Sequence, residues 1–403
     1  MKNKLSIKTT NISVLAINSG SSSIKFAMYR IDGTLERILY GKVDRIGLKG
    51  TSLDFNNLIK NKKGNIRIEV SDHKSVANFL IDWLEKQIDF SLISGVGHRV
   101  VFGMKHTDPE LITNELLDEL HQIIAYDSDH LPAEIELIKV FIHLYPNLNQ
   151  VACFDTAFHR TMPRVAKLLP IPRRFDKIGI QRYGFHGLSY AYLIEELIRV
   201  AGKRVANGRV ILAHLGNGAS LAAVHKGKSV DTSMGFTPAG GMIMGTRPGD
   251  LDPGVAWYMM KSENLTPKQF NNLINHESGL LGISETSSDM RDLLAKESDD
   301  IRAAEAVALF CYQAKKWIGS FVAALGGLDT LVFAGGIGEN CPTIRSRICE
   351  GLGYLGIGLD EKQNIKNAQI ISKAKESVAV RVIHTDEEWM IAKTVNELIK
   401  NNK

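Results

Sequence analysis

The chain contains few cysteines and no long apolar run. None of its four cysteines in 403 residues forms a CxxC pair or another metal-ligand spacing, which indicates reduced thiols and no disulfide framework. Residues 1–17 never sustain an apolar run of signal-peptide length, and nowhere do 18 apolar residues follow one another. These absences exclude a membrane-spanning helix and predict a cytoplasmic protein.

An excess of charge of one sign is also lacking. The net charge is +5, and the lysine-rich stretch at residues 60–70 is typical of solvated turns. We therefore expect neither a nucleic-acid nor a membrane partner. Hydrophobic residues at 44% and charged residues at 23% are ordinary for a globular protein, and a length of 403 residues predicts two domains.

One architecture occurs twice along the chain. Residues 11–45 contain three apolar segments, the first two separated by a serine-rich tip and the last two by the turn Asp32–Gly33. Residues 209–233 repeat the order of strand, small-residue tip, strand, KGK turn and strand. Helices and strands alternate after each copy, as at residues 75–88, 93–101, 114–127 and 150–155 after the first.

The later helices are predicted at residues 285–298, 300–327 and 342–351, and a strand at 328–336 leads into a GGIGEN turn. In the second of these helices, one helical face suits burial: Val307, Phe310, Cys311, Ala314, Trp317, Ile318, Phe321 and Val322. The pattern predicts a duplicated α/β fold with a cleft between the copies. Because no Pro/Gly/Ser linker occurs, we expect a packed hinge near residues 150–160.

The serine-rich tip, NSGSSSIKF at residues 18–26, exposes backbone N–H groups, hydroxyls and the charge of Lys25 at the end of a strand. Alone it is most simply a turn, and it is neither a GxxxxGK[ST] loop nor a GxGxxG motif. Two further tips of this kind, HLGNGAS at 214–220 and FAGGIGEN at 333–340, favour a polyphosphate site.

Phosphoryl transfer also needs arginines for the phosphoryl oxygens and carboxylates for Mg²⁺. Arg99 and Arg247 are the candidate arginines, and Asp155 and Glu387 are the candidate carboxylates. All four lie at ends of apolar segments, as do His130 and His186. Taken singly, each residue has a structural explanation, as a surface arginine, a capping aspartate or a core histidine. Together they form the complete set of groups that phosphoryl transfer needs.

These segments resemble the signature segments of acetate kinases, in the acetate and sugar kinase, Hsc70 and actin superfamily. The resemblance runs from NSGSSSIKF through GHRVV, FDTAFH, RYGFHGLSY, HLGNGAS, SSDMRDL and GGIGEN to TDEEW, and DTSMGFTPAGGMIMGTRPGDLDPG is its most specific part. It implies two ribonuclease-H-like domains around a nucleotide cleft, residues 1–155 plus 388–403 and residues 156–387. It also implies Mg²⁺ with Mn²⁺ as the alternative ion, ATP and ADP as substrates, and a homodimer.

The resemblance also implies site residues. The catalytic set is Arg99, His130, Asp155, His186 and Arg247, and the metal set is Asn18, Asp155 and Glu387. Substrate contacts are Arg99, Val101, Phe185 and Pro238. Nucleotide contacts are Asn18, Ser21 or its serine neighbours, Lys25, His214, Asn217, Gly218, Asp289, Met290, Arg291, Gly336, Ile337 and Gly338.

The implied reaction is ATP-dependent phosphorylation of a short carboxylic acid, acetate first, to an acyl phosphate. The acid is already ionised at pH 7, so it needs no general base, and we assign the histidines to positioning. The two arginines and the metal ion offset the repulsion between carboxylate and triphosphate.

The chain departs from the family pattern near the acyl group. GHRVVFGM replaces GHRVVHGG, with Phe102 and Met104 at the changed places, and GLSY replaces GTSH, with Leu188 and Tyr190. DSDHLP replaces APLHNP, so Asp129 stands in an apolar wall and Leu131 replaces an asparagine. Asp129 either turns towards solvent or indicates an acid with a polar substituent or a looser preference.

Three alternatives remain open at this point. A propionate or butyrate kinase would use the same machinery, since one methylene changes selectivity by only about 1 to 3 kcal/mol. A nucleotide-driven conformational ATPase of the same superfamily would not need both arginines. A structural protein would leave the three phosphate-shaped tips unexplained.

Overall fold

The computed structural model describes residues 12–20, 22–70 and 72–401. The chain divides into two compact units: unit 1 runs to Ala157 and resumes at Asp386, and unit 2 is Phe158–Thr385. The predicted boundaries, 155/156 and 387/388, lie two residues away from these. As a result Glu387, predicted in the second domain, belongs to unit 1.

Unit 1 is built on one mixed sheet with the strand order β5-β4-β3-β2-β1-β6-β8-β7. Strands β1 to β5 form an antiparallel meander, whereas β1, β6 and β8 are parallel. The strands are β1 (Ser13–Ser19), β2 (Ser23–Asp32), β3 (Thr34–Asp44), β4 (Ser52–Asn57), β5 (Lys62–Arg67), β6 (Ile93–Val100), β7 (Glu110–Leu111) and β8 (Asn149–Phe154). The serine tip and the Asp32–Gly33 turn therefore join paired strands, as the sequence predicts.

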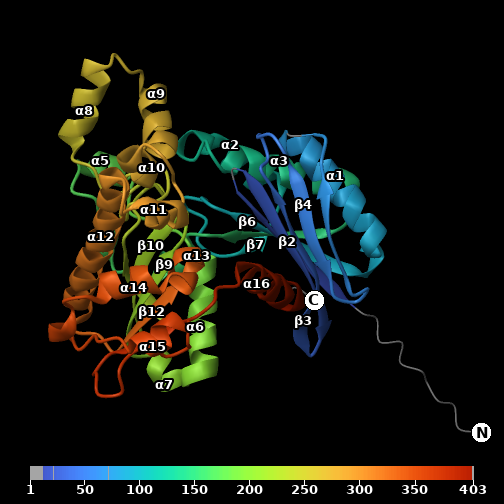
Figure 1. The fold of residues 1–403 in the computed structure, drawn as a ribbon. Coiled ribbons are helices and arrows are strands. Elements are labelled where there is room, and N and C mark those ends of the chain that lie inside the picture. The colour runs from blue at the N-terminus through green and yellow to red at the C-terminus, as the bar shows by residue number, and fades with distance from the viewer. Residues whose placement is uncertain (1–11, 21, 71, 402–403) are drawn as a thin grey trace, which may run out of the picture. The chain divides into compact units, whose positions relative to one another are not determined.

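Helices cover both faces of this sheet (Figure 1). They are α1 (His73–Gln87), α2 (Asn114–Gln122), α3 (Leu131–Leu144) and α16 (Glu387–Asn401), with short helices η1 (Phe90–Leu92) and η2 (Ile124–Tyr126). Helices α1 and α3 bury their apolar side chains against one face, in a core that includes Leu15 and Ile17 of β1. Helix α16 contacts β1, β2 and β6 on the other face.

Two glycines of β6 allow α16 to approach closely. A Cβ at Gly95 would lie 2.5 Å from Ile399, and one at Gly97 would lie 2.4 Å from Ile391. Because side chains alternate along a strand, Arg99 lies on this same face, two residues beyond Gly97. The glycines thus bring the start of α16 to the carboxyl end of β6.

Unit 2 contains a sheet with the order β11-β10-β9-β12-β13, in which β9, β12 and β13 are parallel. Its strands are β9 (Arg209–Leu215), β10 (Ala219–His225), β11 (Lys228–Thr232), β12 (Thr330–Ala334) and β13 (Ala379–Val382). Strands β9 to β11 form a second antiparallel meander. The predicted duplication of the α/β architecture is therefore confirmed.

The helices of unit 2 surround this sheet, with α6 and α7 packed on one face and α12 also in contact with β9, β10 and β11 (Figure 1). They are α4 (Arg164–Lys167), α5 (Arg173–Asp176), α6 (Gly187–Ala201), α7 (Lys203–Ala206), α8 (Pro253–Ser262), α9 (Pro267–Asn272), α10 (Gly279–Ser284), α11 (Met290–Lys296), α12 (Ile301–Leu325), α13 (Gly335–Asn340), α14 (Pro342–Cys349) and α15 (Glu361–Ile365). Short helices are η3 (Ala157–Thr161), η4 (Leu273–Glu277) and η5 (Gly353–Leu355).

Two local predictions in this unit were wrong. The GGIGEN segment is not a turn but helix α13, because Gly335 adopts φ of 75° and a following helical turn starts directly at the end of β12. In α12, Trp317 and Val322 are only half-buried, since they lie at the margin of the buried stripe. No helix among the described residues is long and apolar enough to cross a membrane.

Candidate active site

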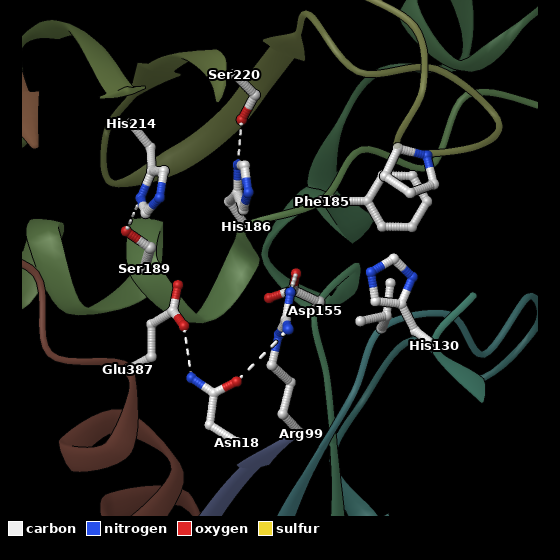
Figure 2. Close-up of polar contacts among 12 residues, drawn as sticks. Asn18, Arg99, His130, Asp155, Phe185, His186, Ser189, His214, Ser220 and Glu387 are labelled. Atoms are coloured by element: carbon white, nitrogen blue, oxygen red, sulfur yellow. Dashed lines mark hydrogen bonds and ion pairs between the residues drawn. The ribbon is translucent and has the colours of Figure 1, made fainter. Parts of the chain in front are cut away.

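The polar residues of unit 1 meet at the carboxyl ends of its parallel strands. Asn18 is the penultimate residue of β1, Arg99 is the penultimate residue of β6, and Asp155 directly follows β8. The Asn18 amide nitrogen donates to Glu387 Oε2 at 2.8 Å and to Glu388 Oε1 at 2.9 Å. Figure 2 shows the amide of Asn18 between Glu387 and Arg99. We call Asn18, Arg99, Asp155 and Glu387 the unit 1 site.

Arg99 is held by an ion pair. Its Nη2 donates to Asp155 Oδ2 at 2.8 Å, and its Nη1 lies 3.5 Å from Asn18 Oδ1. Asp155 is fully buried, and the Arg99 side chain is 15% exposed. Burial lowers the pKa of Arg99, but the charges of Asp155 and Glu387 outweigh burial and raise it. The guanidinium is therefore a permanent, oriented cation.

The oxygen atoms of the unit 1 site suit Mg²⁺, which prefers one or two carboxylates and completes its shell with water and phosphate oxygens. Asp155 and Glu387 supply two carboxylates, and Asn18 supplies an amide oxygen. The described residues contain no group of three or more His, Cys, Asp or Glu arranged for a metal. Two carboxylates and one amide oxygen are donors that fit a hydrated hard ion.

The other predicted residues of unit 1 lie around this site. Val101 is 2% exposed and directly follows β6. Lys25 pairs with Asn18 across the β1–β2 hairpin and is exposed. His130 precedes α3, where its Nδ1 lies 2.7 Å from Asp127 Oδ1. The predicted Ser21 lies outside the described residues.

In unit 2, an arginine and a histidine converge on one glycine. A Cβ at Gly218 would lie 3.0 Å from Arg247 Nη2 and 3.1 Å from His186 Nε2. Arg247 Nη1 donates to the carbonyl of Pro238 at 2.8 Å, so the predicted apolar wall residue holds the arginine through its backbone. We call His186, His214, Gly218 and Arg247 the unit 2 site.

The two histidines of this site stack, with ring centroids 4.3 Å apart. His186 Nδ1 lies 2.8 Å from the hydroxyl of Ser220, and His214 Nδ1 lies 2.8 Å from that of Ser189 (Figure 2). Ser189 in turn contacts the hydroxyl of Thr385 at 2.8 Å. Sequence reasoning missed both serines, although Ser189 lies within the quoted RYGFHGLSY segment and Ser220 within HLGNGAS.

Phe185, predicted as an apolar wall, is 1% exposed, and its carbonyl accepts a hydrogen bond from His159 Nε2 at 3.0 Å. His186 itself adopts a left-handed backbone conformation, with φ of 58°. Non-glycine residues rarely adopt this conformation, and those that do cluster at functional sites. The fold therefore fixes both the ring orientation and the backbone conformation of His186.

A cavity of about 600 Å³ in unit 2 brings together six of the twelve predicted nucleotide contacts. Among the predicted contacts, Asn217, Asp289, Met290, Arg291, Gly336 and Ile337 line it. Gly216, Ser288, Leu294, Asn340 and Cys341 also line it and were missed. Asp289 caps α11 by accepting from the Arg291 backbone N–H at 2.9 Å. This cavity has the size and mixed lining expected of a small-molecule site.

Two side chains that the sequence did not single out hold α13 against this cavity. Glu339 Oε1 accepts from the backbone N–H of Gly335 at 2.9 Å and from that of Thr385 at 3.0 Å. The fully buried Arg345 donates to the carbonyls of Gly338 and Glu339 at 2.8 and 3.1 Å. Because Gly336 and Ile337 belong to the same helix, these contacts position the cavity wall.

Two meander-based α/β units, each with parallel strands whose carboxyl ends carry polar and charged residues, define a protein of the duplicated ribonuclease-H-like, actin-like class. Within that class the chain belongs to the acetokinase family, whose model matches residues 13–393. The acetate kinase of Thermoanaerobacterium thermosaccharolyticum is 42% identical over 97% of this chain and 100% of its own length.

Solved structures give the same family. A propionate kinase from Francisella tularensis has a TM-score of 0.88 at 36% identity, covering 95% of this chain and 98% of its own. Porphyromonas gingivalis acetate kinase has a TM-score of 0.84 at 36% identity, covering 96% of this chain and 100% of its own. The predicted family and fold class are thereby confirmed.

Proposed function

We propose that the protein transfers the γ-phosphoryl group of ATP to a short-chain carboxylic acid, with acetate first among the candidates. The substrate carboxylate forms a bond to the γ-phosphorus, the bond from that phosphorus to the bridging oxygen breaks, and ADP leaves. The observation that carries the proposal is the convergence of Arg247 and His186 on Gly218, beside a cavity lined by the predicted nucleotide contacts.

Each residue has a role that its contacts support. Arg99 binds the substrate carboxylate, and Arg247 stabilises charge on the migrating phosphoryl group. His186 donates or accepts at Nε2 while Ser220 holds its Nδ1. Asn18, Asp155 and Glu387 would hold Mg²⁺, which supplies charge neutralisation on the phosphate oxygens when bound.

Product trapping tests this proposal. Purified protein with MgATP, acetate and hydroxylamine is expected to yield acetyl hydroxamate together with ADP. ATP hydrolysis without hydroxamate, for acetate and for propionate and butyrate alike, would instead identify a conformational ATPase. A propionate or butyrate kinase is the second candidate, favoured by the structural likeness to the propionate kinase and separated by the relative kcat/KM values.

Nucleotide binding to the unit 2 cavity predicts protection of one thiol. Cys341 is half-buried and lines the cavity, whereas burial raises the pKa of Cys153, Cys311 and Cys349 to about 12 each. Iodoacetamide is therefore expected to label Cys341 first, as peptide mass spectrometry would show. ADP at about ten times its Kd should slow this labelling roughly tenfold. Labelling at an unchanged rate would place the nucleotide elsewhere, and Cys341→Ser is the control.

A homodimer is part of the proposal, and helix α8 supports it. None of its residues is buried, and Trp257 and Tyr258 are 67% and 70% exposed. Adjacent exposed aromatic side chains of this kind mark association surfaces. Sedimentation is expected to give a dimer for the wild type and a monomer for the double variant Trp257→Glu, Tyr258→Glu. A dimer that persists in the variant would exclude α8 as the interface.

The proposed compartment is the cytoplasm. Its support is that all four cysteines are free thiols in the described structure, which suits a reducing environment.

A further inference from the structure

Asp127 and His130 form a close pair at the start of α3. His130 Nδ1 lies 2.7 Å from Asp127 Oδ1, and the carboxylate can only accept, so Nδ1 carries a proton. Asp127 is 6% exposed, and the His130 side chain is 20% exposed. The pair therefore fixes the imidazole ring and leaves Nε2 as the nitrogen that can meet a ligand.

The start of α3 is anchored to the strand end that carries Arg99. Glu134, one turn further along α3, accepts from the backbone N–H of Val101 at 3.1 and 3.3 Å with its two carboxyl oxygens. The backbone N–H of Glu134 donates to the carbonyl of His130 at 3.1 Å. Since Val101 follows Arg99 by two residues, His130 belongs to the part of unit 1 that we assign to the acid substrate.

The charge on Asp127 holds His130 in place. Asp127 Oδ2 is buried and has no hydrogen-bond partner in the described part of the chain. Turning His130 away would remove the donor that meets the other oxygen, and a buried acceptor without a donor costs about 1 to 3 kcal/mol.

We propose that the Asp127–His130 pair selects a short carboxylic acid that bears a hydroxyl group over an alkyl acid of the same size. This inference rests on the proposed function and names the chemical class of its substrate. A hydroxyl donates to Nε2 when the imidazole is neutral and accepts from it when the imidazole is protonated. A methyl group in the same place does neither and removes water from Nε2.

The pair also changes which acidic residue of the DSDHLP segment we connect with a polar substrate. Asp129, considered there as the residue that favours a polar substituent, is only half-buried, whereas Asp127 contacts the histidine directly. Asp127 stands where the family segment APLHNP has alanine, and alanine cannot form this pair. The preference is therefore specific to chains that carry an acid at this position.

Glycolate and propionate provide the test, because they differ by a hydroxyl in place of a methyl. With full-length protein, MgATP and hydroxylamine trapping, kcat/KM for glycolate is expected to exceed that for propionate by about tenfold or more. In Asp127→Ala the ratio is expected to fall at least about tenfold, towards the preference of an apolar wall. Glu136→Ala, on helix α3, is the control, since that side chain is 38% exposed, and it should keep the wild-type ratio.

Each outcome decides one question. Propionate preferred over glycolate by the wild type overturns the inference, whether or not Asp127→Ala folds, and so does a ratio that Asp127→Ala leaves unchanged. In both cases hydroxamate formation from acetate leaves the proposed function standing. Absence of hydroxamate from every acid overturns the proposed function itself.

Discussion

Arg247→Ala is expected to lower turnover at least about a hundredfold while leaving the fold intact. At an effective dielectric near 20, a unit charge about 4 Å away is worth roughly 4 kcal/mol, and the variant removes that charge from the phosphoryl group. In the protein without ligand, Arg247 makes a hydrogen bond to the carbonyl of Pro238 from a half-buried position. Steady-state kinetics and thermal melting measure the two effects separately.

Arg99→Ala should behave differently from Arg247→Ala, although both remove a proposed active-site cation. The fully buried Asp155 loses its ion pair at 2.8 Å, and breaking a buried pair costs about 3 to 5 kcal/mol. We therefore expect a lower melting temperature in addition to lost turnover. Arg199→Ala is the control, since that side chain is 70% exposed and pairs with Glu196.

Near-normal turnover in Arg247→Ala would contradict the assignment of Arg247 to the migrating phosphoryl group.

Glu387→Gln is expected to raise the Mg²⁺ concentration for half-maximal rate at least about tenfold, because the substitution removes one of two anionic ligands. The substitution keeps an oxygen that can accept from the Asn18 amide, now at 2.8 Å from Glu387. The loss would therefore report on the carboxylate charge. Titration of the rate with Mg²⁺ at saturating ATP measures it.

Glu388→Gln is the matched control for this charge. Glu388 also accepts from Asn18, at 2.9 Å, but burial raises its pKa, with Lys25 opposing the shift. Because Glu388 is not in the proposed metal set, a neutral isostere should leave the Mg²⁺ dependence within about twofold of the wild type. If Glu387→Gln and Glu388→Gln changed the Mg²⁺ concentration for half-maximal rate equally, the effect would not be specific to Glu387. That result would remove Glu387 from the proposed metal set.

Many features of the fold follow from local sequence patterns. The β1–β2 and β2–β3 hairpins follow from apolar segments separated by a serine tip and by Asp32–Gly33. The second meander follows from the same pattern at residues 209–232. The GGIGEN segment was wrongly predicted as a turn, because a glycine with positive φ follows the strand and a helix begins at once. Glycines permit both outcomes, so their pattern alone does not choose between them.

The candidate sites likewise contain residues that the sequence suggests and supporting residues that only the structure shows. Residue types at the ends of apolar sequence segments made Arg99, Asp155, Arg247 and His186 candidates, because phosphoryl transfer needs arginines and carboxylates. Sequence alone did not identify the supporting residues: Asp127 contacts His130, Ser220 contacts His186, and Glu339 and Arg345 hold α13. Each acts through a contact with a residue distant in the chain or on another turn, as in the 2.9 Å bond between Glu339 and Gly335.

The sequence by itself determined the α/β duplication and the family, because these depend on local periodicity and on motifs within short segments; it also supplied the candidate site residues, which stay predictions. Only the tertiary structure decided which unit holds Glu387, which side chains line the nucleotide cavity, and which carboxylate contacts His130. The physical reason is that hydrogen bonding and burial depend on distances between residues remote in sequence. Such distances are set by how helices pack on sheets, as when Gly95 and Gly97 bring α16 to β6.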